Sequence, residues 1–172
     1  ILRISQQTGI GDSLRKDPVE PVFAEDELFQ LDQVKSDNID YSSLEQYDLI
    51  ILDRLNNIPT GLGQELRKFV KNGGSLSVFP STDPDLNTYN AFLKSLGTDH
   101  YTQLDTTNTR VRTIATDHPL YRNIFKEIPE NIDLPTIQKQ FKLSDRLRSS
   151  KQTLLKCRNG NTFLSSYTHQ KG

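Results

Sequence analysis

Apolar and polar positions in the first half of the chain predict alternating strands and helices. The run Tyr47–Leu52 is almost continuously apolar, as expected of a central strand covered on both faces of a parallel sheet. Residues 61–71 then carry one apolar stripe at helical spacing, for which Thr60 is the predicted N-cap and Gly73-Gly74 the left-handed stop. The pattern predicts a buried strand followed by an amphipathic helix.

Similar elements are predicted on both sides of this pair. Strands are expected over Ile1–Ser5, Phe29–Val34 and Ser75–Pro80, and a second helix over Asn87–Leu96. The polar stretch between the first two strands, rich in Gly and Pro, predicts a loop. A strand–helix–strand–helix order implies a right-handed crossover and a parallel sheet.

The second half of the chain follows a different pattern. Residues 111–116 alternate with period two and could extend the sheet, while residues 119–125 favour one or two helical turns. Residues 132–143 are expected to be extended. Asn159-Gly160 lies between two β-prone segments, and this dipeptide is the strongest short-range signal for a β-hairpin.

Composition limits the classes of function. The 172 residues are 34% hydrophobic and carry 21 Lys and Arg against 22 Asp and Glu, so no global basic field favours nucleic acid. The mean hydropathy is −0.61, and no apolar run approaches the ~20 residues of a membrane span. One cysteine and three separated histidines exclude a disulfide framework and a multi-cysteine zinc site. We predict one domain over residues 1–172, excised from a longer protein because it opens in mid-strand without Met.

The block Tyr47–Leu52, followed by a helix and by the Gly-Gly pair within Phe69–Leu76, resembles the class I glutamine amidotransferase-like superfamily. Thr116–Leu120 matches a His-Pro-Leu element of its non-catalytic and trehalose-utilisation-like branches, and the closing hairpin fits its C-terminal layout. Within the superfamily, residues 29–172 look most like the soluble domain of BatA-type, aerotolerance-related membrane proteins. The resemblance implies a membrane-anchored protein with this domain on the periplasmic side.

Active members of that superfamily place a cysteine nucleophile in the turn after the strand that follows Gly-Gly, with a His-Glu pair further on. Here Pro80 and Ser81 occupy that turn, and the single cysteine, Cys157, lies in the predicted hairpin. Proline offers neither a nucleophile nor an amide donor for an oxyanion hole. The resemblance therefore implies a domain without amidotransferase activity.

Several residues remain as candidates for other chemistry. Asp53, Asp83 and Asp85 follow two neighbouring predicted strands, so their carboxylates could converge at the strand ends and hold a divalent cation, or they could cap a helix. Ser81 could act as a nucleophile with His100 or His118 as its base, or it could satisfy loop amides.

Other motifs have a structural reading beside a functional one. Asp117-His118-Pro119 could polarise a substrate or start a helix, and Cys157 is expected to pack as a small apolar residue. Gly9-Ile10-Gly11 resembles a dinucleotide turn but lacks the third glycine. The cations Lys139, Lys142, Arg146, Arg148 and Lys151, interleaved with Phe141 and Leu143, could line a nucleic-acid groove or a solvated strand face.

The sequence thus predicts an α/β fold: a flavodoxin-like three-layer α/β/α sandwich with a mainly parallel central sheet and a C-terminal β-hairpin. The predicted function is a non-catalytic interaction or scaffold domain of a membrane-anchored protein. Its predicted partners are other protein domains or subunits of a membrane complex, with no nucleic acid, no metal and no cofactor. The alternatives are a metal-dependent hydrolase and a small-molecule sensor, both using Asp53, Asp83 and Asp85.

Overall fold

A computed structural model describes residues 1–6, 19–24, 28–121, 133–146 and 150–169. The chain divides into two units. We call residues 1–92 the N-terminal unit and residues 93–170 the C-terminal unit, and each is described by itself.

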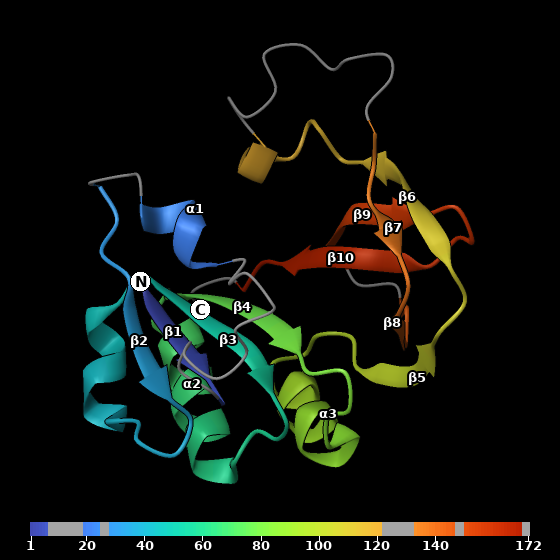
Figure 1. Ribbon diagram of the computed structural model, residues 1–172. Helices are drawn as coiled ribbons and strands as arrows, with labels where there is room; N and C mark the ends of the chain where they lie inside the picture. The colour runs from blue at the N-terminus through green and yellow to red at the C-terminus, as the bar shows by residue number, and fades with distance from the viewer. Residues whose placement is uncertain (7–18, 25–27, 122–132, 147–149, 170–172) are drawn as a thin grey trace. The chain divides into compact units, whose positions relative to one another are not determined.

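The N-terminal unit contains a four-stranded parallel sheet in the order β2-β1-β3-β4 (Figure 1). Its strands are β1 (Leu2–Ser5), β2 (Asp32–Lys35), β3 (Leu49–Leu55) and β4 (Ser75–Pro80). The apolar run predicted as a central strand forms β3, which pairs with β1 on one side and β4 on the other. This confirms the parallel pairing inferred from the alternation of strands and helices.

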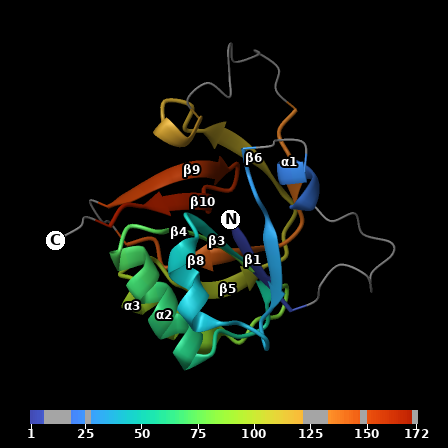
Figure 2. The ribbon, with the colours of Figure 1, turned by 90° about the vertical axis from the view of Figure 1, so that its left-hand side faces the viewer.

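Helical segments connect these strands. They are α1 (Glu20–Ala24), the 3-10 segment η1 (Tyr41–Gln46), α2 (Thr60–Lys71) and α3 (Leu86–Ser95). The segment η1 lies beside α2, where a Cβ added to Gly61 would be 3.5 Å from the Tyr41 ring (Figures 1 and 2). The predicted cap of α2 was wrong, because Thr60 is the first helical residue and Pro59 takes the N-cap position without a side-chain hydrogen bond.

The buried apolar side chains of the N-terminal unit come from its strands, η1 and the inner faces of α2 and α3. They are Leu2, Ile4, Leu44, Ile50, Ile51, Leu52, Leu55, Ile58, Leu62, Leu66, Phe69, Tyr89 and Phe92. Gly74 ends the turn after α2 directly over this core, because a Cβ there would lie 2.2 Å from the Phe69 ring. A close approach of backbone to ring explains the second glycine of the pair.

The C-terminal unit is built from antiparallel strands (Figure 2). One sheet has the order β10-β9-β6-β7, and β5 pairs separately with β8. The elements are β5 (Tyr101–Asp105), β6 (Thr109–Ile114), η2 (Pro119–Tyr121), β7 (Thr136–Ile137), β8 (Gln140–Leu143), β9 (Lys151–Cys157) and β10 (Thr162–Tyr167). The predicted hairpin is confirmed as β9–β10, and Gly160 in its turn has φ +86°.

The predicted fold class was wrong. The described residues contain one parallel sheet of four strands and two antiparallel sheets, so the architecture is not a three-layer sandwich around a mainly parallel sheet. The physical reason lies after α3, where short strands follow one another with tight turns and no described helix long enough for a parallel crossover. Residues 109–114 accordingly pair with β9 and β7 and do not extend the parallel sheet.

No helix in the described ranges is both long and apolar enough to span a membrane. The division into two compact units does not test the prediction of a single domain over residues 1–172, which stays a prediction.

Candidate functional site

The carboxyl end of the parallel sheet holds a buried ion pair. Asp53 at the end of β3 accepts hydrogen bonds on Oδ2 from Arg3 Nε at 3.0 Å and from Arg3 Nη2 at 2.5 Å. Both side chains are almost fully buried, with 3% of Arg3 and 5% of Asp53 exposed. A buried carboxylate held this way is neutralised by the guanidinium on the neighbouring strand.

A second arginine contacts the same carboxylate. Arg54 Nε lies 3.1 Å from Oδ1 of Asp53, and its Nη2 lies 3.3 Å from Oδ2. Arg54 occupies a register irregularity between Asp53 and Leu55 with φ +53°, and half of its side chain is exposed. We call these residues the Arg3–Asp53–Arg54 group.

The other two predicted metal ligands, Asp83 and Asp85, form no hydrogen bond or ion pair with this group among the described residues. Asp85 Oδ1 accepts the backbone N–H of Asn87 at 2.9 Å and so caps the first turn of α3, which is the structural reading of this residue. Asp83 is exposed. Among the described residues, no group of three His, Cys, Asp or Glu side chains could hold a metal ion.

Pro80 is the last residue of β4, where it pairs with Leu55, and Ser81 follows it; the prediction that Pro80 lies in the turn was therefore wrong by one residue. The Ser81 hydroxyl is buried and has no hydrogen-bond partner in the described part of the chain. Its two predicted bases, His100 and His118, belong to the other unit. Gly9-Ile10-Gly11, the weak dinucleotide motif, lies outside the described residues.

His118 has hydrogen-bond contacts at both ring nitrogens. Its Nδ1 accepts the backbone N–H of Leu120 at 3.1 Å, and its Nε2 lies 3.2 Å from the Ser166 hydroxyl. Because Nδ1 accepts, a neutral ring carries its proton on Nε2 and donates to Ser166. This tautomer cannot take the Ser166 proton, so His118 serves to start η2 at Pro119, in line with its structural reading.

Cys157 packs in the core of the C-terminal unit. It is 2% exposed and clusters with Val111 and Ile137. Its Sγ lies 3.5 Å from Gln140 Oε1, and burial raises the pKa of the thiol. The prediction that Cys157 behaves as a small apolar residue is confirmed.

The most strongly connected polar group in the C-terminal unit surrounds Asp99, which the sequence did not single out. Its Oδ1 accepts from the Ser144 hydroxyl at 2.7 Å and the Arg146 backbone N–H at 3.0 Å. Its Oδ2 accepts from the Tyr167 hydroxyl at 2.8 Å, and Lys151 Nζ lies 2.7 Å away. The Asp99 side chain is fully buried, and we call these residues the Asp99 cluster.

Burial and hydrogen bonding compete in this cluster. Burial opposes the charged form of Asp99, but its contacts with Lys151, Arg146, Ser144 and Tyr167 outweigh burial and hold the pKa of the carboxyl well below its usual range. Burial likewise disfavours the charged form of Lys151, yet Asp145 and Asp99 raise the pKa of its ammonium group. The pair is therefore charged at neutral pH, and it joins the ends of β9 and β10 to the start of the unit.

The predicted basic cluster does not form one groove. Lys151 is buried in the Asp99 cluster, and Lys142 lies 3.7 Å from Asp105. Phe141 packs against Tyr101 with ring centroids 5.1 Å apart. Lys139 is exposed, and Arg148 lies outside the described residues.

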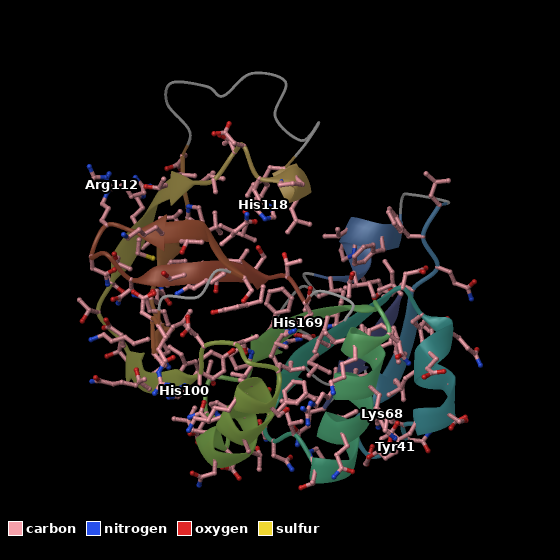
Figure 3. The ribbon with its side chains drawn as sticks, turned by 180° about the vertical axis from the view of Figure 1, so that it is seen from behind. Tyr41, Lys68, His100, Arg112, His118 and His169 are labelled. Carbon is pink, nitrogen blue, oxygen red and sulfur yellow. The ribbon has the colours of Figure 1, made fainter. Side chains whose placement is uncertain are left out.

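A different set of cations gathers on β6 and β9. Val111 pairs with Cys157, and both are buried on one face of the sheet. Arg110 and Arg112 flank Val111, with Arg112 at a register shift, and Lys156 and Arg158 flank Cys157 at the end of β9. Because neighbouring side chains alternate along a strand, these flanking residues point away from the buried face. The Arg158 backbone N–H donates to the Arg110 carbonyl at 2.9 Å, and Arg112 extends outward from β6 (Figure 3). We call these four residues the basic face.

Only one of these cations has an acidic neighbour among the described residues. Arg110 Nη2 lies 2.6 Å from Oδ1 of Asp133, whose side chain is 89% exposed. Arg112, Lys156 and Arg158 are exposed. The excess of Lys and Arg over Asp and Glu within residues 93–170 is the sequence signal that could have indicated this surface.

Comparisons with known proteins bear on the fold. No protein-family model matches the sequence, and no curated protein matches it. Among solved structures, the chain is similar to a ThuA-like protein from Bacteroides uniformis, with 18% identity and a TM-score of 0.55. The match covers 90% of this chain and spans 65% of the length of that one. At this identity the similarity concerns the fold alone.

This comparison corrects the resemblance inferred from the sequence. The structure with a similar fold is ThuA-like, and a ThuA-like protein belongs to a different family from the BatA-type, class I glutamine amidotransferase-like domains. The motifs behind that resemblance were an apolar strand, a helix and a Gly-Gly turn. Here Gly73 supplies the left-handed turn and Gly74 the close approach to Phe69, so local packing alone explains the pair.

Proposed function

We propose that this chain is a non-catalytic interaction domain whose basic face binds an acidic segment or surface of a partner protein. The observation that carries the proposal is the gathering of Arg110, Arg112, Lys156 and Arg158 on one face of two paired strands. The side chains that could support chemistry have other contacts: Asp53 is held by two arginines, and His118 by a backbone N–H and Ser166.

The charge of the whole chain hides this feature. Residues 93–170 contain 12 Lys and Arg against 7 Asp and Glu, a net charge of +5. Residues 1–92 with 171–172 contain 9 Lys and Arg against 15 Asp and Glu, a net charge of −6. A net of −1 is thus the sum of two strongly and oppositely charged parts, and such an asymmetry is typical of chains that bind charged partners.

Like charges on neighbouring strands repel one another. Arg110 lies opposite Arg158 across the pair, whereas Lys156 pairs with Thr113 and Arg112 lies in the irregularity next to Thr113. Opposed like charges such as Arg110 and Arg158 destabilise a sheet by about 0.2–1 kcal/mol per pair. An acidic partner would relieve this repulsion on binding. The relief of the repulsion present in the unbound domain would then strengthen the binding.

The residue types favour a protein partner over single-stranded nucleic acid. Proteins that bind single strands combine cations with aromatic side chains on which bases stack. Neither β6 (TRVRTI) nor β9 (KQTLLKC) contains an aromatic residue. The basic face therefore offers charge and hydrogen-bond donors, which suit carboxylates, without a stacking platform.

A binding experiment tests the proposal. Fluorescence anisotropy with a labelled glutamate-rich peptide should show binding that weakens as salt increases. Arg112→Glu with Lys156→Glu should weaken it by about tenfold or more. The matched control is Arg67→Glu with Lys71→Glu, which makes the same charge change at exposed positions of α2 and should leave binding unchanged.

Two results would contradict the proposal. Equal loss in the control pair would show that only total charge matters. Binding of an oligothymidylate in place of the acidic peptide would identify a nucleic-acid surface. The predicted membrane anchoring and periplasmic location, and the aspartate-based alternatives, stay predictions, and the acidic-partner proposal does not depend on them.

A further inference from the structure

Among the described residues, the Arg3–Asp53–Arg54 group at the carboxyl end of the parallel sheet combines two guanidinium groups with one carboxylate and so carries one positive charge in excess. Arg3 and Asp53 form a buried pair in which the charges balance. Arg54 adds a second guanidinium to the same carboxylate. Among the described residues, Arg54 forms an ion pair with Asp53 alone, and half of its side chain faces solvent.

The backbone at Arg54 makes this arrangement costly. Its φ of +53° lies in the left-handed region, where a Cβ is disfavoured and glycine is the usual residue. The chain leaves regular pairing with β4 at this residue and resumes at Leu55. A residue in such a conformation persists only where its surroundings hold it, and these positions concentrate at binding sites.

The position also favours a ligand. In open parallel sheets, ligands bind outside the carboxyl ends of the strands. Arg54 lies near the carboxyl end of β3, between the buried residues Asp53 and Leu55. The next strand, β4, ends at Pro80, and the hydroxyl of the following residue, Ser81, is buried without a partner in the described part of the chain. A guanidinium with solvent-facing donors at this edge matches the geometry of phosphate and carboxylate groups.

We propose that Arg54 binds a small oxyanion, a phosphate or carboxylate group, at the carboxyl end of the parallel sheet. Asp53 orients the guanidinium through its two hydrogen bonds, and Arg3 neutralises Asp53 so that the charge of Arg54 remains available to the ligand. The site lies in the N-terminal unit and is independent of the basic face.

The test uses thermal unfolding with sodium phosphate, with sodium acetate as the carboxylate probe, each against sodium chloride at equal ionic strength. The unfolding temperature of the wild-type chain should rise with phosphate or acetate beyond the chloride reference, and the stronger response identifies the ligand class. Arg54→Gly should raise the unfolding temperature in chloride, because it relieves the positive φ, and should abolish the oxyanion response. Because the variant is expected to be more stable than the wild type in chloride, general instability cannot explain the loss of its oxyanion response.

The control keeps this result separate from the proposed function. Arg112→Glu with Lys156→Glu removes cations of the basic face and should leave the response unchanged. The proposal is overturned if Arg54→Gly responds like the wild type, or if neither oxyanion exceeds chloride. It is also overturned if the basic-face variant alone loses the response, which would place the anion in the C-terminal unit.

Discussion

The two units of this protein bury apolar side chains and ion pairs in different proportions. In the N-terminal unit, apolar residues of β1, β3, α2 and α3 fill the interior, and Ile4, Leu52 and Leu66 are completely buried. In the C-terminal unit, the apolar cluster of Val111, Ile137 and Cys157 is small, and the charged Asp99 cluster supplies long-range connections. The comparison shows that one chain can combine a unit in which a large apolar interior surrounds one buried ion pair with a unit in which a small apolar cluster lies beside a more extensive hydrogen-bonded ion pair.

This difference predicts different sensitivities to mutation and pH. Loss of an apolar side chain leaves a cavity, whereas removal of one partner of a buried ion pair leaves a charge without compensation. The cost of removing a partner of the ion pair depends on the protonation of the pair and so on pH, whereas the cost of the cavity does not.

The largest expected effect comes from Asp99→Ala. It leaves Lys151 buried with one exposed acidic neighbour, Asp145, and should lower the free energy of unfolding by about 3–5 kcal/mol. Urea unfolding should measure this loss of stability, and hydrogen exchange should show reduced protection in β9 and β10. Asp145→Ala, which removes the 73% exposed partner of the same lysine, should cost only about 0–1 kcal/mol. Similar costs for both variants would mean that burial does not determine the strength of this cluster.

The matching variant in the N-terminal unit is Leu52→Ala. Leu52 is fully buried on the central strand, so its truncation should cost about 2–5 kcal/mol. Hydrogen exchange should accelerate in β1 and β3. The control is Leu164→Ala, at a leucine that is 36% exposed, which should have a smaller effect. A loss at Leu52 that changes with pH as strongly as the loss at Asp99 would contradict the comparison.

Acid unfolding should distinguish the two units next. The folded-state pKa of Asp99 lies below the unfolded value of about 3.9, so its contribution to stability is present above that value and disappears as the pH falls toward the folded pKa. Asp99→Asn removes this contribution. The difference in unfolding free energy between wild type and Asp99→Asn should therefore shrink as the pH falls below about 4. A difference independent of pH from 7 to 2.5 would exclude an ionised, paired Asp99.

The same comparison explains what could be predicted from sequence. The elements of the N-terminal unit are visible because each depends on local spacing: a continuous apolar run for β3 and one stripe for α2. The hairpin β9–β10 is visible because Asn159-Gly160 specifies the turn by itself. Strand β5, with Thr, Gln and Asp among its five residues, offers no such signal, and the fold class was misjudged where local patterns end.

Site residues were missed where partners lie far apart in the chain. Arg3 and Asp53 are 50 residues apart, and Asp99 and Tyr167 are 68 apart. A single acidic residue in a polar loop gives no indication that four donors will converge on it. Asp53 was correctly placed near a strand end, but its ion pair with Arg3 could not be predicted because Arg3 comes from another strand.

The smallest expected effects come from replacing one glycine by alanine in each unit. Gly160→Ala introduces a Cβ at φ +86° with no atom within 4 Å, so the cost of about 1 kcal/mol is due to the backbone alone. Gly61→Ala, in the first turn of α2, makes only an ordinary contact with Tyr41 at 3.5 Å and should stabilise by about 0.5–1 kcal/mol. Thermal unfolding should show shifts of opposite sign. If both variants lose stability, the Tyr41 contact restricts α2 more tightly than its distance indicates, and the N-terminal unit is less tolerant of added volume than its apolar packing suggests.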